Sequence, residues 1–412
     1  MEEQEKQPNE KLRRERELRG WSQQKVAELT GTSNQAVNRW ENGQHKPGRY
    51  FQTLLCELFG KNAEELGFMG DLSFSKTEKK TEQELWIDSQ KESGERDLEY
   101  QWSKTAKRGT SASLNTSSLR FYNYSLSFSW GYYYARGSHA LPPIIDDCLR
   151  SLTESMQTAH GSEQVHLIDL LCRFYQLSGV VARDQMNISR ALSDGKKAVE
   201  LAFSAENVEL IAASLFRRAK TRMKQAQYDA ALQELEAALV YAQRSRDPLK
   251  GYIHQAMAEA YTMLADPYDQ HIQQKSLALL DTVSTIVENG NLEDDGSFVK
   301  LNITGLAMDR ASVFTHFLQP EEARRSLLIA QQHLGTDLNR WRSRLLIANA
   351  ETSLAENDAQ SCCEYLTKAL NIVQETHSRS NEKRVMTIYQ QLSTIAPHSS
   401  FVRQVGEQLR AL

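Results

Sequence analysis

The chain has 412 residues, 40% hydrophobic and 25% charged, with a net charge of −4; this length suggests two to four folded units and excludes binding to nucleic acid through overall charge alone. Its five cysteines form no CxxC pair, which argues against a disulfide framework or a zinc site. Because the start lacks a signal-peptide pattern and no apolar run approaches the roughly 18 residues of a membrane-spanning helix, we expect a cytoplasmic protein without a membrane segment.

The N-terminal segment is locally basic although the whole chain is slightly acidic. Nine Lys and Arg residues but only four acidic residues lie within residues 11–49. Residues 10–19 favour a helix, with Leu12 and Leu18 as its expected inward side chains. Gly20 follows, and glycine commonly ends a helix.

Two further short helices are predicted, each preceded by a serine that can cap it. Ser22 precedes residues 23–29, and Ser33 precedes residues 34–42. Their expected inward side chains are Val26, Ala27, Leu29, Val37 and Trp40. If Gln23 is position one, a small residue falls at position five, a glycine at nine, and apolar residues at fifteen and eighteen. This spacing is typical of a helix-turn-helix, in which the small residue lets two helices cross closely. An ordinary helical bundle is the alternative.

The segment from Leu12 to Leu66 resembles the XRE family, which includes the lambda repressor and Cro. The matching features are a Ser-Gln start of the second helix, a third helix ending in Trp-Glu-x-Gly, a basic turn with Pro47, and an apolar helix over residues 50–60. The resemblance implies a five-helix DNA-binding domain over residues 1–70. It also implies a homodimer on double-stranded DNA, because such domains usually bind two half-sites.

The resemblance further implies which side chains would contact DNA. The start of the recognition helix enters the major groove, while neighbouring helix ends hold phosphates. The candidates for base edges are Asn34, Gln35, Asn38 and Arg39. Amides suit adenine, and arginine suits guanine. The candidates for phosphates are Ser22, Gln23, Lys46 and Arg49. For each of them, a solvent-exposed role without a ligand is the alternative.

Residues 71–118 are rich in polar side chains and indicate a linker. Short helices around Trp86 or Trp102 remain open. The aromatic segment 121–136 admits a strand, a platform for stacking bases, or a capping core in front of the helices that follow; we favour the capping core.

The remaining chain, residues 119–412, is predicted to be a helical repeat domain. Residues 224–239, 317–334 and 355–370 share a spacing of small residues. Ala231, Ala323 and Cys362 are equivalent, as are Ala238, Ala330 and Ala369, and twelve residues before the first set lie Ala219, Ala311 and Ala350. A further copy fits Gly179, Ala191 and Ala198, and a degenerate one fits residues 258–283. This register resembles tetratricopeptide (TPR) repeats. The predicted fold is therefore all-α, with a TPR-like solenoid as its larger part; another helical solenoid is the alternative.

The concave face of such a solenoid presents the first helix of each pair. We expect the following side chains to lie there and to hold an acidic partner segment or a peptide carboxylate: Arg173, Gln176, Arg183, Lys220, Lys224, His316, Arg344 and Glu351. Each could equally face solvent without a ligand.

A helix-turn-helix followed by TPR-like repeats also resembles bacterial regulators in which the repeats bind a signalling peptide and shift the dimer geometry. The expected function is a sequence-specific DNA-binding transcriptional regulator whose repeats sense a peptide or protein partner and dimerise. The alternative is a TPR-type scaffold with an accessory DNA-binding domain. We expect a non-enzyme without cofactor or metal, since no phosphate-binding loop, GxSxG or HExxH motif is present.

Overall fold

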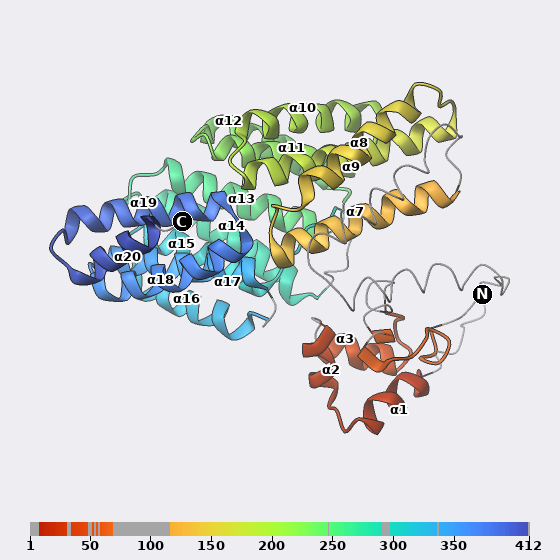
Figure 1. Ribbon diagram of the computed structural model, residues 1–412, viewed down its shortest axis with the longest axis horizontal. Helices are drawn as coiled ribbons and strands as arrows, with labels where there is room; N and C mark the ends of the chain where they lie inside the picture. Colours follow the sequence, from red (N-terminus) through yellow and green to blue (C-terminus); the bar gives the residue numbers. More distant parts are fainter. Residues whose placement is uncertain are drawn as a thin grey trace. The chain divides into compact units, whose positions relative to one another are not determined.

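A computed structural model describes residues 8–30, 34–47, 52, 55–56, 58–68, 116–245, 247–290, 297–335 and 338–410. The chain divides into two compact units, residues 1–93 and 94–412. Within the described ranges every regular element is a helix, which confirms the all-α prediction (Figure 1).

The first unit begins with the three helices of the predicted motif. They are α1 (Glu10–Leu18), α2 (Gln23–Thr30) and α3 (Asn34–Glu41). Gly20 ends α1 and Gly43 follows α3, both at a φ of +66°, a left-handed conformation that glycine adopts without strain. The helices share a core that also takes residues from the apolar segment after α3: Leu12, Val26, Ala27, Val37, Trp40, Leu55, Phe59, Leu66 and Phe68.

Two of the expected inward side chains face solvent instead. Leu18 is 70% exposed and Leu29 is 45% exposed. Leu18 lies six residues after the buried Leu12, which places it about 240° around the helix, away from the core. On α2 the inward position belongs to Thr30, whose hydroxyl donates to the Val26 carbonyl at 2.7 Å. The prediction for these two leucines was wrong because it weighed hydrophobicity above helical phase.

The second unit is built from longer helices. They are α7 (Thr116–Arg136), α8 (Leu141–Met156), α9 (Ser162–Asp184), α10 (Ile188–Ser204), α11 (Val208–Met223), α12 (Tyr228–Ala242), α13 (Asp247–Leu264), α14 (Gln270–Glu288), α15 (Ile303–His316), α16 (Pro320–His333), α17 (Asn339–Ala355), α18 (Ala359–Thr376), α19 (Arg379–Ile395) and α20 (Ser400–Arg410). From α9 to α18, consecutive helices pack as pairs, and each pair packs on the next. This is the helical-hairpin stacking of a TPR-like solenoid.

Small residues lie where paired helices meet. The predicted repeat positions, from Gly179 to Ala369, are all buried. A Cβ atom on Gly179 would stand only 3.3 Å from the Ala191 carbonyl oxygen, so α9 and α10 approach closely at this point. In the degenerate copy, Ala258 on α13 is followed by Ser276 and Val283 on α14, all three buried. The small residues of this copy are 18 positions apart instead of 12, because the end of α13, the turn and the start of α14 are each longer than in the other pairs.

The cysteines are packing residues. None of the five, which all lie in the described ranges, forms a disulfide, and Cys362 occupies a small-residue position of its repeat. Burial raises the pKa of Cys148 and of Cys362 to about 12, so neither thiol ionises near neutral pH.

The aromatic segment forms helix α7, so the strand alternative was wrong. Residues 116–118, assigned above to the linker, also belong to this helix. Trp130 stacks on Phe298 with ring centroids 5.8 Å apart, and the Tyr134 hydroxyl donates to the Phe298 carbonyl at 2.8 Å. These packed aromatics form the capping core that the sequence analysis favoured. The possible helices around Trp86 and Trp102 lie outside the described residues.

A buried carboxylate joins the two ends of the solenoid. Asp184, at the end of α9, is 3% exposed. It accepts hydrogen bonds from Arg340 of α17 at 2.9 Å, from Ser138 after α7 at 2.6 Å, and from Ser378 before α19 at 3.0 Å. Arg340 also donates to the Tyr133 hydroxyl at 2.6 Å. The superhelix therefore turns far enough for its last pairs to contact α7 and α9.

Helix α9 is the one described helix that is long and apolar enough to cross a membrane. Of its apolar window, 67% is buried inside the protein. The core helix of a helical domain meets the same criteria of length and composition, and the burial is that of a core helix.

The repeat packing makes a prediction about volume. Ala231→Leu adds three carbons where α11 and α12 touch, so we expect a loss of about 1–3 kcal/mol in the free energy of unfolding. Gln233→Leu, at an exposed position of the same helix, is the control and should change it by less than about 0.5 kcal/mol. Urea unfolding followed by circular dichroism measures both, and equal effects would contradict the close packing of this pair.

Candidate functional site

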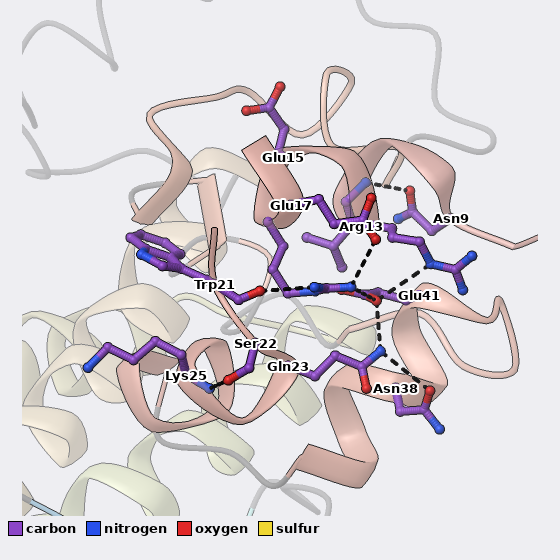
Figure 2. A network of polar contacts seen from close by, with 12 residues as sticks. Asn9, Arg13, Glu15, Glu17, Trp21, Ser22, Gln23, Lys25, Asn38 and Glu41 are labelled. Atoms are coloured by element: carbon purple, nitrogen blue, oxygen red, sulfur yellow. Dashed lines mark hydrogen bonds and ion pairs between the residues drawn. The ribbon is translucent and has the colours of Figure 1, made fainter. Parts of the chain in front are cut away.

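One fully buried carboxylate, that of Glu41, holds the three helices of the first unit together. Its Oε1 accepts from Arg16 Nε of α1 at 2.6 Å, and its Oε2 accepts from Arg16 Nη2 at 2.9 Å. Gln23 of α2 donates to Oε2 at 2.8 Å, and Arg13 Nε lies 3.7 Å from the same oxygen. Figure 2 shows Gln23 and Arg13 directed at Glu41. We call Glu41, Arg16 and Gln23 the Glu41 clamp.

The electrostatics of the clamp are those of a satisfied buried ion pair. The hydrogen bond to Glu41 raises the pKa of Arg16. Arg16 also donates to the Trp21 carbonyl at 3.0 Å, so its charge is solvated by protein groups on several sides. The clamp fixes α3 against α1 and α2. Glu41 is the glutamate of the Trp-Glu-x-Gly motif, and its partners Arg16 and Gln23 could not be predicted from that motif.

The four predicted base-reading residues share the outer face of α3. Asn34, Gln35, Asn38 and Arg39 are all exposed, while Val37 and Trp40 on the opposite face are buried. The outer face therefore presents two amides, a third amide one turn later, and a guanidinium. This set can donate to and accept from base edges in a major groove.

The predicted phosphate-binding residues fall in different settings. Ser22 is exposed at the start of α2, where its Oγ accepts from the Lys25 backbone N–H at 3.0 Å and so caps the helix as expected. Lys46 is exposed beyond α3. Gln23 is half-buried in the clamp. Arg49 lies outside the described residues.

Comparisons with known proteins agree with this geometry. A family model described as helix-turn-helix matches residues 12–66. No curated protein matches the chain. The first unit is thus a helix-turn-helix DNA-binding domain of the XRE type, and the second is a TPR-like helical repeat unit.

Two solved structures share the helical character of the chain. One comes from a study of Pseudomonas aeruginosa PilF, with 13% identity, a TM-score of 0.34, and coverage of 70% of this chain and 97% of that one. The other is ComR from S. thermophilus in complex with DNA and its signalling peptide ComS, with 14% identity, a TM-score of 0.26, and coverage of 92% and 96%. At such TM-scores neither likeness supports a functional argument.

In the second unit, charged side chains gather from the first helices of successive pairs. We call them the charged cluster: Arg183 of α9, Lys220 and Lys224 at the end of α11, Glu259 of α13, Asp309 of α15, Arg344 and Glu351 of α17, and Arg384 of α19. Lys220 pairs with Glu259, and Arg384 pairs with Glu351 at 2.7 Å. Arg344 lies over the Trp341 ring, 5.2 Å from its centroid.

Burial among these charges shifts several pKa values. Desolvation lowers the pKa of Lys224 to about 8, and the nearby Arg384 adds to this effect. Desolvation raises the pKa of Asp309 to about 6. Burial would raise the pKa of Glu259, but Lys220 and Lys224 outweigh it and bring the pKa to about 2. Lys224 is therefore a lysine that loses its charge within reach of neutral pH.

The structure brings together five of the eight side chains predicted for the concave face and leaves three elsewhere. Arg183, Lys220, Lys224, Arg344 and Glu351 belong to the charged cluster. Gln176 is buried and donates to Ser214 at 2.8 Å, which removes it from the exposed surface. His316 bonds the Ala265 carbonyl at 3.0 Å, and Arg173 pairs with Asp169 at 2.7 Å.

Sequence reasoning missed Glu259, Asp309 and Arg384. A signal for Glu259 exists, because it directly follows Ala258 just as Lys220 follows Ala219. The longer spacing between the small residues of the third pair, α13 and α14, hides this register in the sequence. Among the described residues, no group of three or more His, Cys, Asp or Glu side chains is arranged to hold a metal ion.

The clamp predicts a large difference between two glutamates that both contact Arg16. Glu41→Ala leaves a largely buried guanidinium without its bidentate partner, so we expect a loss of about 3–5 kcal/mol in the stability of the first unit. Glu17→Ala removes a pair at 3.5 Å whose carboxylate is 60% exposed, and should cost less than about 1 kcal/mol. Thermal unfolding of the full chain, followed at the first unit's transition, measures both; similar losses would refute the clamp.

Proposed function

We propose that this protein is a sequence-specific transcriptional regulator that reads DNA with the outer face of α3. One observation carries the proposal: Asn34, Gln35, Asn38 and Arg39 are exposed together on a helix that a buried ion pair fixes in orientation. Base reading needs such rigidity, because hydrogen bonds to base edges tolerate little displacement. We propose that the protein acts in the cytoplasm and that its partner there is double-stranded DNA.

The two kinds of DNA contact should respond differently to loss of one positive charge. Arg39→Ala removes a base-reading group, so it should relax the preference at one base pair, with discrimination falling by about 1–3 kcal/mol. Lys46→Ala should weaken binding to all sequences alike and reduce the salt dependence of binding. Fluorescence anisotropy on a selected duplex and on its single-base variants distinguishes these effects. Identical profiles for the two variants would contradict the assignment.

We also propose that the TPR-like unit senses a peptide or protein segment carrying a carboxylate, which binds at the charged cluster. The cluster has five cationic and three anionic side chains, and two of the anions are already paired internally. Among the described residues Lys220, and not Lys224, forms the ion pair with Glu259, whose charge acts on Lys224 from a longer distance. Lys224 is exposed, and the neighbouring cations Arg384, Lys220 and Arg183 help to lower its pKa, so an incoming anion would meet several positive charges at once.

This proposal predicts a pH dependence. Lys224 is charged below pH 8 and neutral above it, so retention of carboxylate-bearing peptides should fall as pH rises from 7 to 9. A displayed random-peptide library, selected on immobilised full-length protein, provides the probes. Lys224→Met should abolish retention, whereas Lys196→Met, on an exposed lysine of α10, should not. Failure to enrich any peptide, or an unchanged pH profile in Lys224→Met, would contradict the proposed site.

Dimerisation through the TPR-like unit would couple the two activities. A ligand changes DNA binding only if it binds one dimer geometry more tightly than another. Light scattering of the full chain, with and without an enriched peptide, tests the dimer.

The second candidate function is a scaffold with an accessory DNA-binding domain, favoured by the size of the charged cluster. This alternative predicts that the protein binds DNA without sequence preference. The proposed function includes no catalysis.

A further inference from the structure

Within the described part of the chain, Asn38 is the one base-reading candidate whose side chain hydrogen-bonds to neighbouring side chains. Its Oδ1 accepts a hydrogen bond from Asn42 Nδ2 at 2.9 Å. Gln23 Nε2 points at the same oxygen from a longer distance, 3.5 Å (Figure 2). The oxygen of this amide is therefore occupied from within the protein, and the direction in which its NH2 group faces is set by these partners.

The polarity of this arrangement follows from Arg13. Arg13 Nη2 donates to Asn42 Oδ1 at 2.8 Å. A guanidinium has only donors, so Asn42 must turn its oxygen toward Arg13 and its NH2 toward Asn38. Asn38 must then turn its oxygen toward Asn42 and leave its own NH2 for an outside acceptor. Although amide oxygen and nitrogen are hard to distinguish by shape, a fixed donor at one end decides both orientations.

Gln23 is oriented by the same logic. The Glu41 carboxylate has only acceptors, so Gln23 must direct its Nε2 inward, which leaves Oε1 as its outward atom. A carbonyl oxygen does not bind phosphate. Gln23 therefore fits the predicted phosphate contact poorly and suits a donor instead.

We infer that Arg13 and Asn42 are positioning residues that make Asn38 a hydrogen-bond donor toward DNA, so that Asn38 selects bases presenting acceptors. Guanine O6 and thymine O4 are such acceptors, at the positions where adenine N6 and cytosine N4 are donors. The bidentate adenine contact expected of amides also needs the amide oxygen, which Asn42 already uses. This inference rests on the proposed reading of DNA by α3, and deepens it by naming the base class at one position.

We call the hydrogen bonds from Arg13 through Asn42 to Asn38 the relay, and the test reverses their direction. Asn42→Asp offers only acceptors, so Asn38 must turn its NH2 toward Asp and present its oxygen outward. Random-sequence DNA selection with the full chain should then show a change at one base pair, from guanine or thymine to adenine or cytosine at the contacted base, by about fivefold or more. Asn38→Ala identifies that base pair, because the preference there should be lost.

Two further variants separate this effect from charge and from misfolding. Gln44→Glu adds the same negative charge at an exposed neighbour outside the relay, and should weaken binding while leaving the preference unchanged. Arg13→Met frees Asn42 to turn either way, and should relax the preference at the same base pair; it decides the matter if Asn42→Asp does not fold.

The outcomes are distinct. Suppose that the wild type selects a motif, and that the preference at the base pair contacted by Asn38 is unchanged in both Arg13→Met and a folded Asn42→Asp. This result overturns the relay and leaves DNA reading by α3 intact. The relay is likewise overturned if Asn38→Ala selects the same motif as the wild type. No enriched motif for the wild type overturns the proposed function, and the relay with it.

Discussion

The buried ion pair of Glu41 with Arg16 is the constraint on which the DNA-reading surface depends. A carboxylate without solvent contact is stable only when donors surround it, and here the donors come from α1 and α2. The three helices therefore cannot shift independently. The orientation of α3, and with it every exposed side chain on its outer face, follows from this one interaction.

The second unit uses a buried carboxylate in a comparable way over a longer range of sequence. Asp184 joins α9 to α17 through Arg340 and to the start of α19 through Ser378. Close packing of small residues builds each helix pair, whereas this polar contact holds the last pairs of the stack against α7 and α9. The curvature of the stack brings charged side chains from six different helices into one cluster.

Much of this architecture could be predicted from the sequence, because it is expressed in local patterns. Caps, glycines and apolar spacing located α1 to α3, and recurrent alanines located most of the helix pairs. Three kinds of feature were not predicted from the sequence. Leu18 was misplaced because hydrophobicity was weighed above helical phase. Glu259 was missed because its repeat has a longer spacing between small residues, and the Glu41 clamp because its partners are 25 and 18 residues away in sequence.

The central claim is that a rigidly held α3 reads a defined DNA sequence. The most direct measurement is random-sequence DNA selection with the purified full-length protein at physiological ionic strength. The account predicts an enriched motif, with two half-sites if the protein dimerises, centred about one helical turn apart or a multiple of that. Uniform recovery of all sequences, with an affinity that depends only on salt, would contradict it.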